Sequence, residues 1–106
     1  MKNNFRLIRD KEITSIKPGE KITIQRIESP EFLLRASREI STLYQEALSS
    51  KSHEKFADII EMIKNAAEIA EVDWNKVNKT LFNKRWESGK YGSFIGLKSN
   101  QDSLKP

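Results

Sequence analysis

Cysteine is absent from this chain of 106 residues. Without it, neither a disulfide framework nor a cysteine-ligated zinc site can form. Long apolar runs are also missing, since no stretch approaches the roughly 18 apolar residues that a membrane span requires. No apolar segment of the secretory type follows the charged N-terminus. With 32% charged residues, the chain is expected to be a soluble, cytoplasmic protein.

The usual catalytic motifs are lacking as well. The single histidine, His53, falls in a polar connector and has neither cysteine nor a paired acid at ligand spacing, so it predicts no zinc site and no nucleophile triad. No glycine-rich phosphate loop is present. The surplus of Lys and Arg over Asp and Glu, 19 against 15, gives a net charge of only +4. Because aromatic and basic residues are not interleaved on one predicted element, no nucleic-acid partner is expected.

The length fits one domain, which we place at residues 1–97, followed by a flexible polar tail over 98–106. A chain of this size buries roughly two-thirds of the surface that it exposes when unfolded, which leaves a modest core. We therefore expect a homo-oligomer, either a dimer or a tetramer.

Helical periodicity dominates the middle of the chain. Apolar residues recur at helical spacing from Phe32 to Leu48, after Ser29 as a candidate N-cap and Pro30 as a first-turn residue. This predicts a helix that ends near residue 49. Ser52 is positioned to cap a second helix, and so short a connector predicts an antiparallel helical hairpin.

A third helix is expected after Asp73, with Gly89 as its stop signal. The first 28 residues are irregular, and the alternation over residues 21–27 predicts an extended segment or a short strand. The fold class is therefore predicted to be all-α: a helical hairpin, a third helix and an extended N-terminal arm.

An ordered set of strings runs along the chain. Leu7-Ile8-Arg9-Asp10-Lys11 comes first, a glutamate-led Phe32-Leu33 helix and Phe56-Ala57-Asp58-Ile59-Ile60-Glu61 follow, and a helix with Lys84 leads into Gly89-Lys90-Tyr91. Over about residues 5–97 this order resembles the MazG-like, or phosphoribosyl-ATP pyrophosphohydrolase-like, all-α nucleotide pyrophosphohydrolases.

The resemblance implies a specific chemistry. Members of this family cleave a nucleoside triphosphate between its α- and β-phosphates and release pyrophosphate. They hold Mg²⁺ through acids on two antiparallel helices, in the pattern E-E-x-x-E followed by E-x-x-D. Mg²⁺ prefers oxygen ligands, and carboxylates three or four residues apart share one helix face.

Aligned residue by residue, this chain keeps only part of the acidic pattern. Glu46 and Asp58 match metal ligands, whereas Thr42, Leu43 and Lys55 stand where the family carries carboxylates. An ammonium group at residue 55 would repel Mg²⁺ and would instead pair with Asp58 or Glu46.

Two further acids offer an alternative, because Glu39 and Glu61 lie on nearly the same faces as Glu46 and Asp58 and would make a relocated cluster. The opposing interpretation is that they are solvated surface charges. For phosphate binding, the resemblance and the residue types point to Arg9, Lys11, Lys84 and Tyr91. The competing interpretation pairs Arg9 with an aspartate, pins the N-terminal segment onto the helices and leaves the lysines as solvated charges.

Three hypotheses follow for the function. The first is a MazG-like protein with weak or lost Mg²⁺-dependent pyrophosphohydrolase activity and retained nucleotide binding. The second is an active enzyme with a relocated acidic cluster or with acids from a partner subunit. The third is a structural or interaction protein without catalysis.

Overall fold

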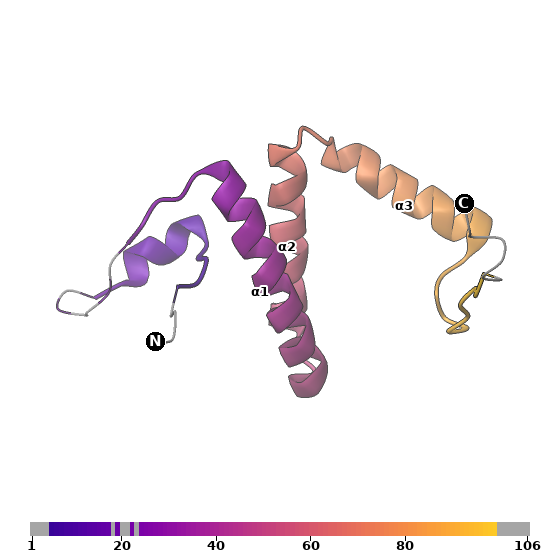
Figure 1. The fold of residues 1–106 in the computed structure, drawn as a ribbon, viewed down its shortest axis with the longest axis horizontal. Coiled ribbons are helices and arrows are strands. Elements are labelled where there is room, and N and C mark those ends of the chain that lie inside the picture. Colours follow the sequence, from indigo (N-terminus) through magenta and orange to yellow (C-terminus); the bar gives the residue numbers. More distant parts are fainter. Residues whose placement is uncertain (1–4, 18, 20–21, 23, 100–106) are drawn as a thin grey trace. The chain divides into compact units, whose positions relative to one another are not determined.

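Helices make up the regular structure of the protein. The computed structural model describes residues 5–17, 19, 22 and 24–99. In chain order the elements are a 3₁₀ helix, η1 (Asp10–Ser15), and three α-helices, α1 (Ser29–Ser50), α2 (His53–Ile69) and α3 (Trp74–Ser88) (Figure 1). Since these described residues form helices and no strand, the all-α prediction is confirmed.

The helices α1 and α2 form the predicted antiparallel hairpin and lie side by side (Figure 1). The chain reverses at Lys51, which adopts the left-handed conformation with φ of 54° and ends α1. Ser52 then caps α2, because its side chain accepts a hydrogen bond of 3.1 Å from the backbone N–H of Lys55. The predicted cap at Ser52 is therefore confirmed.

The start of α1 differs from the prediction by one residue. Glu28 occupies the N-cap position in an extended conformation, and its carbonyl accepts a 2.9 Å hydrogen bond from the Phe32 N–H. Ser29 is already helical, so the prediction that it is the cap is wrong. The side chain of Glu28 makes no capping hydrogen bond. N-cap positions favour Ser, Thr, Asp and Asn, so residue preferences alone predicted the neighbouring Ser29 as the cap.

The N-terminal arm contains a turn of helix that the sequence did not predict. In η1, the N–H of Glu12 donates to the Arg9 carbonyl at 2.9 Å, and the Arg9 N–H donates to the Glu12 carboxylate at 3.0 Å. Further along the arm, Ile22 and residues 24–27 are in no strand, while Lys21 and Thr23 lie outside the described residues. The short-strand alternative is wrong for this described part, because a strand needs a partner to pair with.

Small side chains allow the two helices of the hairpin to approach. Ala36 and Ala47 on α1 are 1% and 0% exposed, and Ile59 on α2 is 8% exposed. Among the described residues these three are the only buried ones. The hairpin therefore has a narrow seam of packed residues, with its larger apolar side chains partly exposed.

The chain divides into two compact units, Met1–Trp74 and Asn75–Pro106. In the second unit, Gly89 ends α3 as predicted, with φ of 85° and a 2.9 Å hydrogen bond from its N–H to the Arg85 carbonyl. Of the predicted tail, Lys98 and Ser99 lack regular structure, and residues 100–106 lie outside the described part. One domain over residues 1–97 stays a prediction.

None of the helices in the described residues combines the length and apolar character needed to cross a membrane.

Candidate functional site

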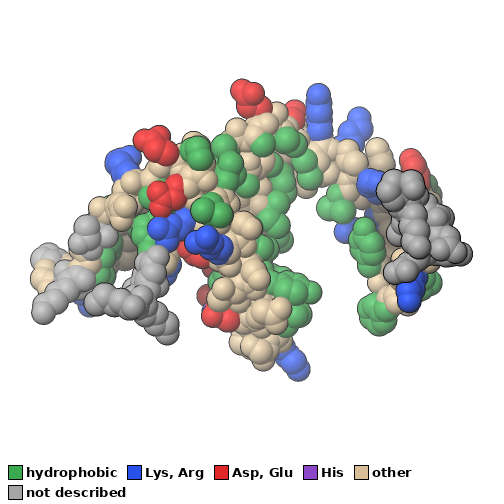
Figure 2. Space-filling view, viewed as in Figure 1, with side chains coloured by type: hydrophobic (Ala, Val, Ile, Leu, Met, Phe, Trp, Pro, Cys, Tyr) green, Lys and Arg blue, Asp and Glu red, His purple; other side chains and the backbone are tan. Residues whose placement is uncertain are grey.

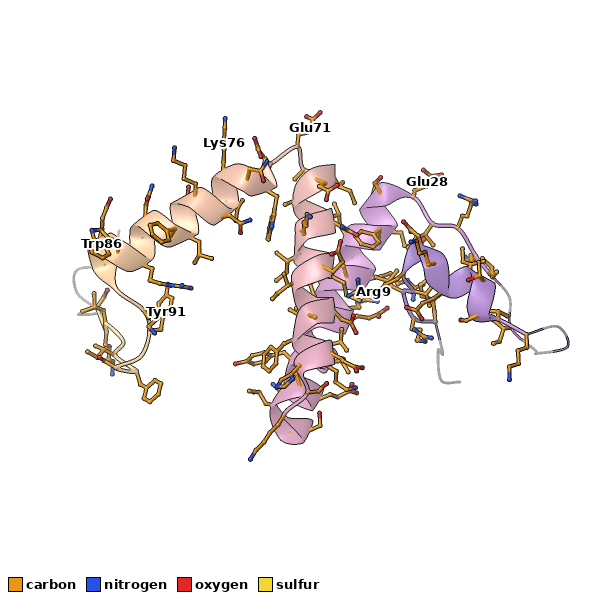
Figure 3. The ribbon with its side chains drawn as sticks, turned by 180° about the vertical axis from the view of Figure 1, so that it is seen from behind. Arg9, Glu28, Glu71, Lys76, Trp86 and Tyr91 are labelled. Atoms are coloured by element: carbon orange, nitrogen blue, oxygen red, sulfur yellow. The ribbon has the colours of Figure 1, made fainter. Side chains whose placement is uncertain are left out.

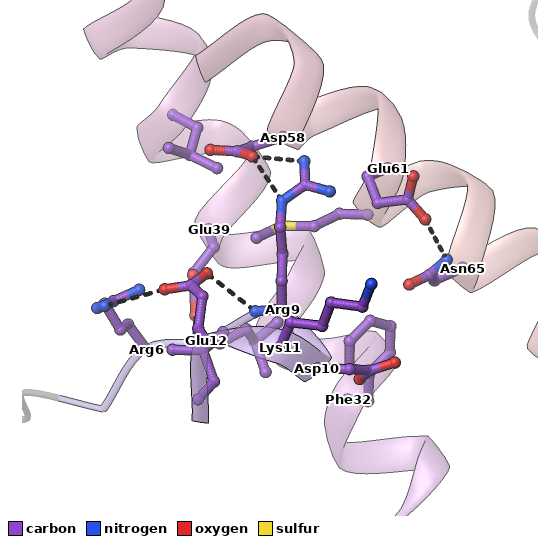
Figure 4. A pocket seen from close by; sticks show the side chains of 14 residues that line it. Arg6, Arg9, Asp10, Lys11, Glu12, Phe32, Glu39, Asp58, Glu61 and Asn65 are labelled. Atoms are coloured by element: carbon purple, nitrogen blue, oxygen red, sulfur yellow. Dashed lines mark hydrogen bonds and ion pairs between the residues drawn. The ribbon is translucent and has the colours of Figure 1, made fainter. Parts of the chain in front are cut away.

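A cavity of about 560 Å³ lies where the N-terminal segment meets α1 and α2 (Figure 4). We call residues 5–16 the N-terminal strap, because this segment crosses the hairpin and forms one side of the pocket. Arg9 and Lys11 line it from the strap, Glu39 from α1, and Asp58 and Glu61 from α2. The volume lies within the range of about 300–1,000 Å³ that is typical of small-molecule sites.

The strongest contact in the pocket joins Arg9 to Asp58. The Nη2 and Nε atoms of Arg9 donate to one carboxylate oxygen of Asp58, at 2.6 and 3.1 Å (Figure 4). The hydrogen bond to Asp58 raises the pKa of Arg9 above its usual value, partial loss of hydration opposes this, and the charges of Asp58, Glu61 and Glu12 raise it further. Arg9 is therefore a permanent cation beside this aspartate.

Two further contacts bind the strap to α1. The backbone N–H of Leu7 donates to the Glu39 carboxylate at 2.7 Å. The guanidinium of Arg35 lies over the ring of Phe5, 4.2 Å from its centroid, in a cation–π contact. The strap thus engages Glu39 on α1 and Asp58 on α2, two acids for which the sequence predicted a metal-binding role. The interpretation that Arg9 pins the N-terminal segment onto the helices describes this geometry.

Glu46 pairs with Lys55, one of the two arrangements predicted for this lysine. Lys55 Nζ lies 2.8 Å from Glu46 Oε1, across the junction between α1 and α2. Of the two partners proposed for Lys55, the structure pairs it with Glu46, since Asp58 is taken by Arg9. Glu46 and Lys55 are not among the residues that line the pocket.

Leu43 and Thr42, which the sequence resemblance aligns with metal-binding acids, have ordinary structural roles. Leu43 lines the pocket as an apolar wall. The hydroxyl of Thr42 donates to the Arg38 carbonyl one turn earlier, at 3.4 Å. Neither side chain supplies a carboxylate oxygen at its position.

The acids of the hairpin do not fit a Mg²⁺ site as they stand. Glu39, Glu46 and Asp58 each accept from a donor of this chain, and Glu61 accepts from Asn65 Nδ2 at 2.9 Å. Within the described ranges, no group of three or more Asp, Glu or His side chains is close enough to hold a metal ion. Because Mg²⁺ needs several oxygen ligands around one point, these acids do not form a ligand set for the ion.

The charge of the pocket lining is acidic overall. Five acids, Asp10, Glu12, Glu39, Asp58 and Glu61, face three cations, Arg6, Arg9 and Lys11. Arg6 is 3.5 Å from Glu12, so one cation is already engaged within the strap. A phosphate entering this pocket therefore meets carboxylates as well as Arg9 and Lys11.

The other two predicted phosphate-binding residues belong to the second compact unit. Lys84 is on α3, and Tyr91 is in the segment after it with 95% of its surface exposed. The structure brings Arg9, Lys11, Glu39, Asp58 and Glu61 together around one pocket of the first unit.

Several pocket residues carried no sequence signal of their own. Glu12 and Met62 fall outside the acidic patterns, and the backbone N–H that binds Glu39 comes from Leu7, far away in sequence. The pairing of Glu61 with Asn65, four residues apart on one helix, follows directly from helical spacing.

Comparison with family models, curated proteins and solved structures finds no match for this chain.

Proposed function

We propose that this chain is a MazG-like protein in which Mg²⁺-dependent pyrophosphohydrolase activity is weak or lost and nucleotide binding is retained. One observation carries the proposal. Both acids that the family resemblance assigns to the metal, Glu46 and Asp58, are paired with a cation of the chain, Lys55 at 2.8 Å and Arg9 at 2.6 Å.

The electrostatic reason is direct. A divalent ion at Glu46 or Asp58 would have to displace an ammonium or guanidinium group that already neutralises the carboxylate. If the cation lost its carboxylate partner but stayed beside it, its positive charge would repel the metal ion at short range. Both pairs are partly exposed, with side chains 37–51% accessible, so water screens them and some residual metal binding is compatible with the proposal.

The nucleotide site that we propose is the strap pocket. A phosphate group would compete with Asp58 for Arg9, whose guanidinium fork suits phosphate oxygens, and Lys11 would add a second positive charge. Since acids outnumber cations in the lining, a nucleotide that arrives with its own Mg²⁺ would meet less repulsion than the free anion.

The test combines turnover with binding. The full chain is incubated with Mg²⁺ or Mn²⁺ and a panel of nucleoside triphosphates, and monophosphate and pyrophosphate are quantified. We expect turnover near the background rate, together with a nucleotide-dependent rise in melting temperature that Arg9→Gln and Lys11→Gln reduce. Arg38→Gln, an exposed cation on α1 away from the pocket lining, is the matched control. Robust turnover abolished by Glu46→Ala or Asp58→Ala would overturn the proposal.

An active enzyme is the second candidate. Its support is that Glu39, Asp58 and Glu61, from both helices of the hairpin, line one pocket. Acids from a partner subunit would complete the ligand set. Turnover that survives Glu46→Ala but is lost in Glu39→Gln or Glu61→Gln would favour this candidate over the first.

A non-catalytic interaction protein on the same scaffold is the third candidate. It predicts neither turnover nor a nucleotide-dependent thermal shift. All three candidates include a cytoplasmic homo-oligomer, a dimer or tetramer, which the exposed apolar side chains of the hairpin support.

A further inference from the structure

The positive charge of the chain is concentrated in its second unit. Residues 75–99 contain six Lys and Arg against one Glu, a net charge of +5. Residues 1–74 contain twelve Lys and Arg against thirteen Asp and Glu, a net charge of −1. The mild overall surplus of +4 therefore hides a strongly basic segment of 25 residues, which comprises α3 from its second residue onward and the described chain after it.

Aromatic side chains in this segment are unusually open to solvent. Phe82 and Trp86 on α3 are 67% and 85% exposed, and Tyr91 and Phe94 beyond the helix are 95% and 94% exposed. Figure 3 shows Trp86 on the last turns of α3 and Tyr91 in the segment that follows. Large aromatic rings are normally among the most buried side chains of a protein, so four open rings in one basic segment call for a partner.

Cations accompany these rings closely. Arg85 precedes Trp86 and Lys90 precedes Tyr91 in the sequence. On α3, Lys79 lies three residues before Phe82, and Trp86 follows four residues later, so all three project from one helix face. The alternation of cations and rings continues from α3 into the irregular segment after it, so no single element carries all of it.

We propose that residues 75–99 bind single-stranded nucleic acid. Unpaired bases stack on aromatic side chains while neighbouring Lys and Arg follow the phosphates, and this combination is tolerant of sequence. Exposed rings have nothing to stack on in an intact duplex, which hides the faces of its bases, so the single strand is the form that the segment fits.

Other occupants fit less well. A helix that lies on an anionic membrane keeps its cations on the face opposite the apolar one, whereas α3 places Lys79 on the face that carries Phe82 and Trp86. A second copy of the same segment would set one charge of +5 against another, which opposes self-association through this surface.

The test measures binding of the full chain to a fluorescein-labelled mixed-sequence oligonucleotide of twenty nucleotides by fluorescence anisotropy, over a series of salt concentrations. We expect saturable binding that weakens with salt. Removing two phosphate contacts with Lys84→Gln/Lys90→Gln should lower the log–log salt slope by about 1.4, since each neutralised phosphate of a single strand contributes roughly 0.7. Arg38→Gln/Lys51→Gln, which removes two exposed cations from the first unit, should leave the slope unchanged.

Stacking is tested separately from charge. Trp86→Ala and Tyr91→Ala should each weaken binding roughly tenfold without changing the salt slope, and Trp86→Phe should recover most of the loss. Arg38→Gln, an exposed cation of the other unit outside the strap pocket, should bind the oligonucleotide like the unaltered chain.

Three results would overturn the inference. The first is an absence of binding at 50 mM salt with about 100 μM protein, where non-specific sites of this kind are occupied. The second is cosedimentation with vesicles containing phosphatidylserine while the oligonucleotide stays free. The third is binding that the Lys84→Gln/Lys90→Gln and aromatic variants leave unchanged.

Discussion

At the scale of single residues, the central feature is Lys55, which stands where the family resemblance would place a carboxylate. Its ammonium group lies 2.8 Å from Glu46, so the position that the family resemblance gives to a metal ligand holds a counter-ion instead. The pair is partly exposed, and exposed pairs stabilise a fold by only about 0.2–1 kcal/mol. The pair therefore matters less for the stability of the fold than for the positive charge of Lys55, which would repel a divalent ion.

Reversing this charge is the first prediction. In Lys55→Glu, a carboxylate stands beside Glu46 at the family's ligand position, so Mn²⁺ should bind at least about tenfold more tightly by isothermal titration calorimetry, an energy well within reach of one added ion pair at short range. Lys64→Glu makes the same charge change nine residues further along α2, on the opposite face, and should leave Mn²⁺ affinity within about twofold. Equal affinities in the two variants would show that Lys55 is not in a latent metal pocket.

Arg9 supports a second prediction at this scale. In the described residues its contact with Asp58 is the one ion pair that joins the strap to α2. Arg9→Gln should therefore increase amide hydrogen exchange across η1, while the hydrogen bond from Leu7 to Glu39 keeps the start of the strap protected for longer. Arg6→Gln removes a cation whose partner, Glu12, lies within the strap, and it should change exchange much less. Unaltered exchange in Arg9→Gln would mean that apolar contacts hold the strap.

At the scale of elements, local signals predicted the helix ends unevenly. Ser52 begins α2 and Gly89 ends α3, as expected. A capping hydroxyl and a glycine with positive φ both act on residues close in sequence, so a local pattern predicts them. Glu28 caps α1 with its backbone alone, and η1 is held by Glu12 reaching back to Arg9. Neither arrangement has a strong composition signal, so both were missed.

The cap at Ser52 gives the third prediction. Ser52→Ala leaves the Lys55 N–H without its side-chain acceptor and should lower the free energy of unfolding by about 1 kcal/mol. Ser49→Ala is the matched control, since the Ser49 hydroxyl donates to the Glu46 carbonyl within α1 and satisfies no free helix-start N–H. Urea denaturation followed by circular dichroism measures both. A loss in Ser49→Ala as large as that in Ser52→Ala would contradict a specific capping role.

At the scale of the whole molecule, the residue types of the site could be predicted from the sequence but their pairing could not. From the sequence, Lys55 had two candidate partners, Asp58 and Glu46, and Arg9 had a phosphate or an unnamed aspartate. The choice of Arg9 for Asp58, which leaves Lys55 to Glu46, depends on how the strap crosses the hairpin. Contacts between residues 49 positions apart arise from tertiary packing, which periodicity does not encode.

The whole chain also leaves apolar surface uncovered. Leu34, Leu48 and Ile60 of the hairpin are 53%, 51% and 58% exposed, and Figure 2 shows hydrophobic side chains along the helices of the first unit. Monomeric soluble proteins rarely expose contiguous apolar patches of large area, and such patches mark interaction sites. A second copy of the hairpin, whose unit carries a net charge of only −1, meets little repulsion there.

The fourth prediction is therefore self-association through the hairpin. Light scattering after gel filtration should give a mass of at least twice the 12.3 kDa of one chain at about 50 μM protein, and the melting temperature should rise with concentration. Ile60→Glu buries a charge in the interface and should shift the mass to that of one chain. Ile13→Glu places the same charge on the strap, at a side chain 43% exposed, and should leave the assembly intact. If the unaltered protein has the mass of a single chain at that concentration, the apolar face of the hairpin serves something other than a second copy.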